Sequence, residues 1–514
     1  MCFQYGTDSN EKQTAEEESP FWVEQLETYL APYSQRLDAY LDRRVVGNLT
    51  ATVAGIVQTR SPLTTSELGS VICGPEHAEA GTQRLQRAFH HQGWKSERIE
   101  EVLWEQAEKS RKEMEQQGET PLCIWDSSVL EKPESLKLEG LGSVRSSRVR
   151  RLARSRPGVF NRPGIPVSVR GFEWESLVLV GKSAVPQVVA MRWWSREKGG
   201  SSQQRHQQEA RFRKAALRWG RKVRHVFDRG YGTGPWLWRL WMSQVRFVVR
   251  WKKGNKLIDA SGQERKAWEI ARGKRPWGEG RLLWDTHFRV YRSTRVLARP
   301  LHHPEYRGPL WLVVVRQGKG REPWYLLTNE PVETAEQAWD ITLSYVRSLQ
   351  IEESFRFQKT ELQIESLRLQ DWESRRKMLL LVTLASGFLL WLLSPPLWLA
   401  RSKLLLHWCP PSRLALVEGQ SSRLSPSLGT GVGSGKRIPH AFRAGIPLVG
   451  SLTSPGPSAL YPGGPLFGTS ADVCSKTLLW VMSIPRNDFI GGRSFPPSPR
   501  NDFIGGRSWF ELPR

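Results

Sequence analysis

Hydrophobic residues recur along the chain at two spacings, which separate helical stretches from strand-rich ones. From Phe21 to about residue 117 they recur every three or four positions, as in "EQLETYLAPYSQRLDAYL" (24–41), the spacing of amphipathic helices. Between 118 and 251, short apolar runs alternate with helical patterns, in an order typical of an α/β layer domain. The runs predict strands at 122–129, twice within 176–194, at 223–228 and at 245–251, and helices at 207–220 and 234–242.

Further along the chain the pattern changes twice. Residues 252–333 hold strand-like runs separated by Gly/Pro turns, which predict a β-rich insertion, and helical periodicity returns at Thr334. Beyond 410, Pro, Gly and Ser dominate, and "PRNDFIGGRS" occurs twice. The predicted divisions are a disordered segment (1–20), a helical domain (21–117), the first part of an α/β core (118–251), the β-rich insertion (252–333), the second part of the core (334–409) and a low-complexity tail (410–514).

The helical domain contains a candidate DNA-reading unit. Thr64 and Glu67 have capping-box spacing, which predicts a helix start. After a Gly-Pro break, the segment 81–94 turns Leu85, Ala88 and Phe89 toward a core and Arg84 and Arg87 outward. A short helix followed by a basic helix is what a helix-turn-helix motif requires. An ordinary helical bundle explains the pattern equally well.

The apolar run 378–393 raises the question of a membrane. It spans 16 residues, has basic residues before it and Pro395 and Pro396 after it, and is shorter than the roughly 20 residues that a span needs. We therefore expect a buried core helix rather than a membrane anchor. The five cysteines are scattered without a C-x-x-C pair, which argues against disulfides and zinc and favours a reducing cytoplasm.

The charge balance points to a polyanionic partner. Seventy-five Lys and Arg residues face 51 Asp and Glu residues, a net charge of +24. Nucleic acid is the commonest partner of such a chain, although a generic basic surface gives the same balance. The segment 143–158 has six arginines, Arg148 and Arg151 among them, and no acid. It is either a solvated, mobile segment or a clamp for DNA phosphates.

Three carboxylates stand out against this basic background. Asp126 and Asp228 each follow a strand-like apolar run, and Glu352 lies in the helical segment 345–359. Two strand-end aspartates and a helical glutamate can converge at one edge of a sheet, where their repulsion requires a cation. Mg²⁺ prefers such oxygen ligands, and two ions suit phosphodiester chemistry. The alternative is that Asp228 pairs with Arg229 or another arginine and only orders the turn.

The spacing around Glu352 supports a site. Tyr345, Glu352 and Lys359 are seven residues apart, about two helical turns, so one helix would project all three from one face. Lys359 could hold a phosphate, and Tyr345 could contact sugar or phosphate beside Glu352. Chance on a charged helix gives the same spacing.

Together, "IWDSSVLEKPES", "VFDRGYG" and "YVRSLQIEESFRFQK" resemble the DDE transposases of bacterial insertion sequences, in the group with a Tyr-x2-Arg-x3-Glu-x6-Lys signature. Tyr345, Glu352 and Lys359 fit that spacing, whereas the signature arginine position holds Ser348 and Arg347 comes one residue early. The resemblance covers roughly residues 20–400.

This resemblance implies a fold, a reaction and partners. The fold is a ribonuclease H-like core split by the β-rich insertion, and the reaction is metal-dependent cleavage at transposon ends followed by strand transfer. Asp126, Asp228 and Glu352 would hold Mg²⁺, or Mn²⁺ as a substitute, and the DNA would be bound by a homodimer. DNA-contacting residues would be Tyr345, Lys359 and Arg347, with Arg229 in the turn that presents Asp228, the N-terminal helices binding the inverted repeats, and the arginines named above. The expected location is the cytoplasm, on the nucleoid. A catalytically inactive DNA-binding remnant of such an enzyme is the alternative function.

Overall fold

The computed structural model describes residues 9–59, 63–156, 159–181, 186–194, 200–285, 290–318 and 321–392. Its helices are α1 (Ser9–Asp38), α2 (Arg43–Gln58), α3 (Thr65–Cys73), α4 (Ala78–His90), α5 (Ser96–Gln116), α6 (Gly200–Trp219), α7 (Gly234–Met242), α8 (Ala267–Ala271), α9 (Ala335–Arg347), α10 (Leu349–Thr360) and α11 (Trp372–Trp391). Its strands are β1 (Leu122–Glu131), β2 (Gly142–Arg156), β3 (Val159–Val180), β4 (Gln187–Trp194), β5 (Arg224–Phe227), β6 (Arg246–Trp251), β7 (Lys256–Asp259), β8 (Glu264–Lys266), β9 (Trp277–Asp285), β10 (Val290–His303), β11 (Tyr306–Arg316) and β12 (Trp324–Thr328). The mixed α/β class predicted from the sequence is confirmed.

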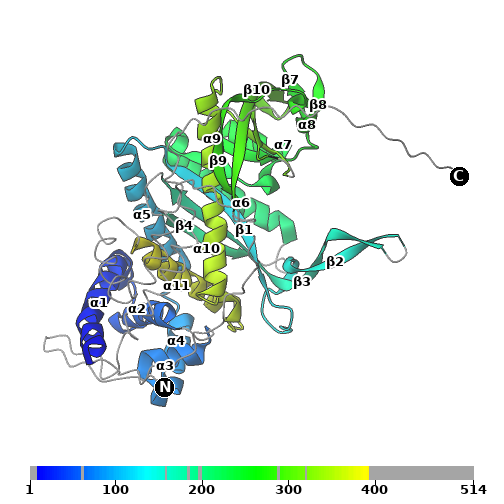
Figure 1. Cartoon of the computed structure of the whole chain (residues 1–514). Coiled ribbons are helices and arrows are strands. Elements are labelled where there is room, and N and C mark those ends of the chain that lie inside the picture. Colours follow the sequence, from blue (N-terminus) through cyan, green and yellow to red (C-terminus); the bar gives the residue numbers. More distant parts are fainter. Residues whose placement is uncertain are drawn as a thin grey trace, which may run out of the picture.

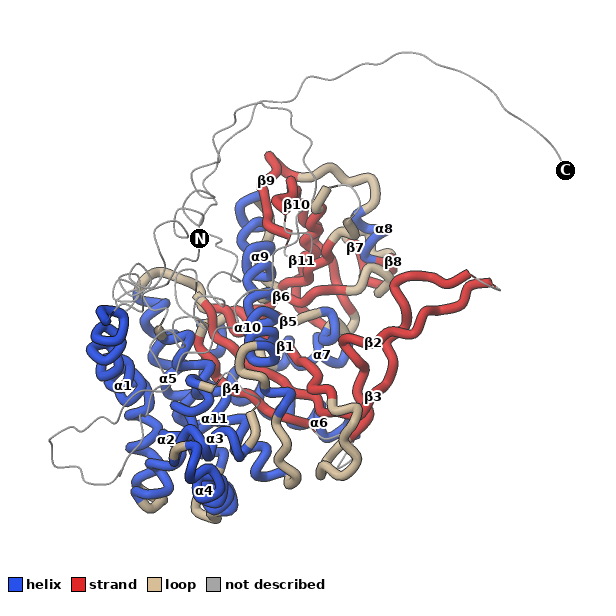
Figure 2. Tube along the Cα trace, turned by 60° about the horizontal axis from the view of Figure 1, so that its bottom comes forward, coloured by secondary structure: helices blue, strands red, loops and turns tan. Residues whose placement is uncertain are grey.

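The strands form one large sheet. Its order is β2-β3-β1-β5-β6-β12-β11-β10-β7-β8, with β4 beside β3 and β9 beside β10. Strands β1, β5 and β6 are parallel neighbours, whereas β3 lies antiparallel to β1 and β12 antiparallel to β6. The strand-rich stretch after β6 therefore extends the same sheet, and Figures 1 and 2 show it as the lobe opposite the N-terminal helices. Strands dominate this stretch as the Gly/Pro turns predict, although the prediction omitted α8.

Both faces of the sheet centre are covered, which explains the continuous apolar runs of its strands. Along β1, Leu122 and Ile124 join a core with residues of α1–α5 and α9–α11. Cys123 and Trp125 point to the opposite face and join a second core with residues of α5–α7. Period-two alternation thus assigns each β1 side chain to one of two layers, and we call these the Ile124 face and the Trp125 face.

Helix α11 is a core helix, as the sequence predicts. Its side chains from Met378 to Leu390 are buried except Gly387, and they belong to the core on the Ile124 face. Two of the three cations before the run, Arg375 and Lys377, are buried in the fold. The Arg375 guanidinium donates to the carbonyls of Leu369, Gln370 and Glu139, and Lys377 Nζ donates to the carbonyl of Phe89 at 2.6 Å. Among the described helices, none is both long and apolar enough to cross a membrane.

The N-terminal helices confirm part of the helix-turn-helix pattern. Thr64 caps α3 by accepting from the Glu67 N–H at 3.1 Å. Helices α3 and α4 cross so closely that a Cβ on Gly81 would lie 2.2 Å from the Gly69 carbonyl oxygen, so glycine is required there. Leu85, Ala88 and Phe89 are buried as expected.

The predicted orientation of Arg84 is wrong, whereas that of Arg87 is correct. Arg87 is exposed. Arg84 is half-buried, because its guanidinium donates to Asn48 Oδ1 at 2.8 Å and contacts Cys73 Sγ. It braces α4 against α2 instead of facing solvent.

The arginine-rich segment predicted at 143–158 forms a β-strand over its described residues. Residues 142–156 are β2, paired antiparallel with the first half of β3. The two strands project from the body as a long two-stranded arm (Figures 1 and 2). The side chains of Arg148 and Arg151 are outside what the structure describes, so their contacts with DNA stay a prediction.

Two predicted boundaries shift. Helix α1 begins at Ser9, within the range 1–20 that the sequence predicted to be disordered. Ser348 separates α9 from α10, so the single helix predicted over 345–359 is interrupted, although Ser348 keeps helical dihedral angles of −62° and −20°. Residues 1–8 and the predicted tail 410–514 lie outside the described residues.

Candidate functional site

Asp126 and Asp228 lie on neighbouring strands. Strands β1 and β5 are parallel, and Trp125 pairs with Phe227 at the end of their pairing. The residue after each member of that pair is an aspartate, so the two carboxylates lie at the same level. Strand β5 ends there, as the sequence predicts for Asp228, whereas β1 continues to Glu131, so the prediction that Asp126 ends its strand is wrong. The end of such a parallel pairing is a common place for sites in α/β proteins.

Alternation places both aspartates toward the Ile124 face. Asp126 is two residues beyond Ile124, and Asp228 is two residues beyond Val226, which shares the core of that face. Helix α10 contacts β1 and contributes Ile351 and Phe355 to the same core. Figures 1 and 2 show α10 lying across this part of the sheet.

The charges of three carboxyl groups meet at Asp126. Burial raises the pKa of Asp126 well above its ordinary value, and the negative charges of Asp228, Glu352 and Glu175 raise it further, against a hydrogen bond from the Ser127 N–H at 2.8 Å. Glu352, exposed on α10, thus lies near enough for its charge to act on Asp126. Within the described residues, no three His, Cys, Asp or Glu side chains stand close enough to hold a metal ion. The three carboxylates have the donor chemistry of a hard divalent ion, but their side chains would have to move closer together to bind one.

Tyr345 connects α9 to Asp228. Its hydroxyl donates to Asp228 Oδ1 at 3.2 Å and accepts from Arg250 Nη1 at 3.2 Å. Burial and the charge of Asp228 raise the pKa of Tyr345, so the hydroxyl keeps its proton at neutral pH. The Arg250 guanidinium also lies 5.7 Å from the ring centroid of Trp324. The Tyr345 hydroxyl therefore links the Arg250 guanidinium to the Asp228 carboxylate.

The sequence analysis missed Arg250 although a signal exists. It lies on β6, two residues from Val248, whose side chain is in the core of the Ile124 face. The same alternation that places the aspartates therefore places Arg250 beside them.

The remaining predicted residues occupy different positions. Lys359 is half-buried on α10, with Nζ 5.6 Å from the ring centroid of Trp174 on β3, so it faces the sheet like Tyr345. Arg347 is half-buried at the end of α9, and Arg229 is exposed after Asp228. The Asp228 carboxylate accepts a hydrogen bond from Tyr345.

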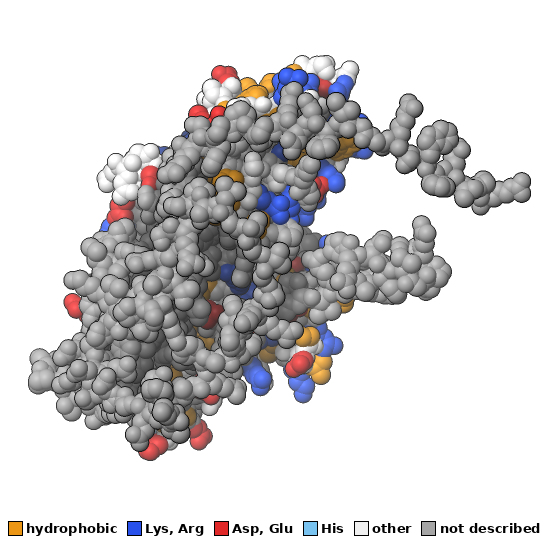
Figure 3. All heavy atoms as spheres, in the orientation of Figure 1, with side chains coloured by type: hydrophobic (Ala, Val, Ile, Leu, Met, Phe, Trp, Pro, Cys, Tyr) orange, Lys and Arg blue, Asp and Glu red, His pale blue; other side chains and the backbone are white. Residues whose placement is uncertain are grey.

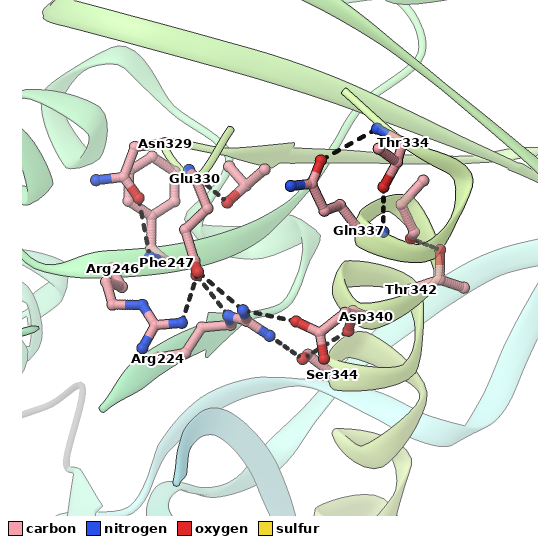
Figure 4. A network of polar contacts seen from close by, with 12 residues as sticks. Arg224, Arg246, Phe247, Asn329, Glu330, Thr334, Gln337, Asp340, Thr342 and Ser344 are labelled. Carbon is pink, nitrogen blue, oxygen red and sulfur yellow. Dashed lines mark hydrogen bonds and ion pairs between the residues drawn. The ribbon is translucent and has the colours of Figure 1, made fainter. Parts of the chain in front are cut away.

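A buried ionic network fixes α9 relative to β5 (Figure 4). The Arg224 guanidinium on β5 is paired with Glu330 and with Asp340 of α9 at 2.8 Å, and donates to Ser344 Oγ at 2.6 Å. Arg246 of β6 also pairs with Glu330, at 2.6 Å. Burial alone would raise the pKa of Glu330, but its hydrogen bonds and ion pairs with the two arginines lower it. Strand β5 ends beside Asp228 and α9 carries Tyr345, so the network sets their relative position.

Basic side chains and a polar cavity lie around the core. Figure 3 shows Lys and Arg side chains mainly on the side of the arm, and Asp and Glu side chains mainly along the opposite edge.

A cavity of about 520 Å³ lies between α5, β4 and α6, lined by Glu100, Arg192, Trp194 and Arg211 among others. None of the three predicted carboxylates lines it. Its ionic groups are largely paired with one another, as in the Arg192–Glu100 pair.

No family model and no curated protein matches the chain. Among solved structures, it is similar to a cryo-EM structure of a piggyBac transposase synaptic complex with hairpin DNA. The identity is 12% and the TM-score 0.30, and the match covers 61% of this chain and 59% of that one. The chain thus matches about three fifths of that structure's length. At these values the similarity carries no argument about function, which has to come from the chain's own geometry.

Proposed function

We propose that the chain is a DNA transposase of the DDE type, which binds transposon ends, cleaves the DNA and transfers the strand. One observation carries the proposal. Asp126 within β1 and Asp228 directly after its parallel neighbour β5 lie on one face, and Glu352 on α10 is close enough to affect the pKa of Asp126. Three like charges at one point destabilise the site unless cations bind there, and a chain of net charge +24 is suited to DNA.

The strand order supports a ribonuclease H-like core. In β4-β3-β1-β5-β6, β3 runs antiparallel to both β4 and β1, and the last three strands are parallel. Asp126 lies in the central strand β1, and Asp228 follows its parallel neighbour β5. In this proposal, 252–333 is an insertion that extends the core sheet through the β6–β12 pairing.

The proposed roles follow from the contacts. Asp126, Asp228 and Glu352 would hold two Mg²⁺ ions, or Mn²⁺, which supply activation of the attacking oxygen and stabilisation of the leaving oxygen. Tyr345 orients Asp228 through its hydrogen bond, and Arg250 supplies a fixed positive charge beside it. Lys359, Arg347 and Arg229 would contact DNA phosphates near the site. The proposed partners are duplex transposon ends and target DNA, held by a homodimer on the nucleoid.

A cleavage assay tests this function. Purified protein is incubated with labelled duplex carrying the ends of the element that encodes it, with Mg²⁺ or with EDTA. Wild type should cut at the ends only with metal, and Glu352→Gln should lose at least about a thousandfold in rate, since it removes a proposed metal ligand. The control is Glu361→Gln, at the end of the same helix, which should cut like wild type. Equal cutting by Glu352→Gln and wild type would contradict the proposal.

A second candidate is an inactive DNA-binding remnant of such an enzyme. Ser348 favours it, because this position interrupts the helix and holds serine where the resembling transposases have arginine. Specific binding of the ends without cutting in Mg²⁺ or Mn²⁺ would select this candidate.

A further inference from the structure

A buried acid, a buried cation and a tyrosine meet directly behind the two aspartates. Glu175 on β3 is 0% exposed. The Tyr231 hydroxyl donates to its Oε1 at 2.6 Å, and Arg211 Nη2 of α6 lies 2.9 Å from its Oε2. The Arg211 guanidinium also stacks on Trp194, 4.6 Å from the ring centroid. The sequence analysis assigned a role to none of these residues.

Glu175 is not placed to be another metal ligand. It pairs with Ser127 across β1 and lies next to Leu177 on the Trp125 face, whereas Asp126 projects from the Ile124 face. Its Oε1 accepts from Tyr231, its Oε2 forms an ion pair but no hydrogen bond with Arg211, and the residue is closed to solvent. Its effect on the site must therefore pass through other residues.

Tyr231 provides the physical link to the site. It is the last residue of the short 3₁₀ turn Arg229–Tyr231, for which Asp228 is the N-cap. Its N–H donates to the Asp228 carbonyl at 3.0 Å, and its ring packs on Phe227 and Trp236. Glu175 belongs to β3, whose next residue, Ser176, pairs with Asp126. A single hydrogen bond thus ties the turn that carries Asp228 to the strand beside Asp126.

A purely structural role does not explain the free energy that this buried ionic network costs. Burying a carboxylate and a guanidinium costs desolvation, and apolar side chains of similar volume often stabilise a core as well or better. Tyr231 already contributes its ring to packing without its hydroxyl. What the hydroxyl and the charged acceptor add is a fixed direction for the turn.

We propose that Tyr231 and Glu175 are positioning residues, whose hydrogen bond holds the Asp228 turn against β3 so that Asp228 and Asp126 are placed together for divalent ions. This inference rests on the proposed function. Arg211 supplies the counter-charge to Glu175, and a carboxylate acceptor makes the bond from Tyr231 stronger than one between neutral groups.

The test is Mn²⁺ binding to the full chain without DNA, measured by the electron paramagnetic resonance of free Mn²⁺. Tyr231→Phe removes only the hydroxyl and should weaken Mn²⁺ binding about tenfold, as loss of supporting hydrogen bonds around metal sites does. Tyr306→Phe is the control, because Tyr306 is buried, whereas Tyr231 is half-buried, and its hydroxyl also forms a side-chain hydrogen bond, accepting from Asn329 at 3.0 Å on the β-rich lobe. This control should bind Mn²⁺ like wild type and lose similar thermal stability.

Glu175→Gln separates position from charge. It keeps an acceptor for Tyr231 but removes the negative charge, and adding Tyr231→Phe to it should weaken Mn²⁺ binding less than Tyr231→Phe does alone. If Glu175→Gln does not fold, Tyr231→Phe still decides. A Tyr231→Phe protein with wild-type Mn²⁺ affinity and the melting temperature of the control would overturn the inference.

Failure of the proposed function gives a different result. Asp126→Asn should abolish Mn²⁺ binding if the three-carboxylate site exists. If wild type and Asp126→Asn bind Mn²⁺ equally, the site itself is wrong and the inference falls with it. If Asp126→Asn abolishes binding and Tyr231→Phe leaves it unchanged, the site stands and only the positioning role is wrong.

Discussion

Asp126 links the stability of the folded chain to pH and to divalent ions. Burial and then the charges of Asp228, Glu352 and Glu175 raise its pKa. A carboxyl group with a higher pKa in the folded than in the unfolded state makes the folded state bind more protons. The contribution of Asp126 to the free energy of unfolding is therefore highest below the unfolded pKa of about 3.9. It declines as the pH rises toward the folded pKa. A bound cation would reverse the decline.

We expect Asp126→Asn to stabilise the metal-free protein at pH 8. The amide keeps the shape and removes one of the repelling charges, and each pKa unit of the raised value corresponds to about 1.4 kcal/mol. The gain should be roughly 1 kcal/mol or more in urea unfolding with EDTA, and smaller at pH 5. Adding Mg²⁺ should stabilise wild type but not the variant. If the stabilities of the two proteins depended on pH identically, the fold would not destabilise the ionised form of Asp126.

At this scale the sequence predicts the residues that depend on local pattern. Asp126 and Asp228 follow apolar runs, so their shared level on neighbouring strands is readable, although β1 continues past Asp126, and alternation would have yielded Arg250. Local sequence does not distinguish Glu175 from its neighbour Glu173 in "FEWESLVLV". Its partners, Arg211 and Tyr231, come from other elements, and no local spacing specifies which side chains a fold brings together.

Helix α9 and strand β5 form a unit through Arg224. The side chains of Arg224 and Glu330 are 4% and 15% exposed, so their charges depend on each other rather than on water. The low pKa of Glu330 adds stability above its unfolded pKa, and this stability is lost as pH falls through the folded pKa. Because Tyr345 and Asp228 lie on the two elements, the network also sets their distance.

We expect Arg224→Met to destabilise the chain by about 3–5 kcal/mol at pH 7, because it leaves Glu330 short of a partner in a buried position. The control, Arg281→Met, breaks an ion pair with Glu336, whose side chain is 77% exposed. It should lower the free energy of unfolding by at most about 1 kcal/mol. Urea unfolding at pH 7 and pH 4 measures both. The difference between Arg224→Met and wild type should shrink at pH 4, where Glu330 begins to be protonated, and an equal difference at both pH values would contradict the assigned pairing.

The elements themselves were predicted unevenly, for physical reasons. The strand–helix order from β3 to β6 follows from apolar runs and turn residues, and the structure confirms it. The segment of strand β2 was predicted to be either a solvated, mobile segment or a phosphate clamp, because its arginines have no apolar period, yet it pairs with β3, with register shifts. The break at Ser348 was also missed. Pairing between distant strands and a one-residue interruption leave little trace in local sequence.

At the scale of the whole molecule, the proposed function requires the excess positive charge to bind DNA. Figure 3 shows basic side chains mainly on the side of the arm, and the arm's β2 has six arginines and no acid. A two-stranded ribbon fits the DNA major groove, and cations that contact phosphates release counterions. Composition predicted a polyanionic partner, but only the fold shows that the basic segment stands away from the body, where duplex could reach it.

We expect the arm to account for part of the salt dependence of DNA binding. Replacing Arg148 and Arg151 with alanine should weaken binding to duplex of any sequence and reduce the slope of log affinity against log salt by about 1–2, since each phosphate contact contributes about 0.9. The control replaces Lys109 and Lys112 of α5, away from the arm, and has the same net charge. Fluorescence anisotropy between low and moderate salt measures the slopes. If both variants change the slope equally, net charge rather than the arm governs binding, and Arg148 and Arg151 are not phosphate contacts.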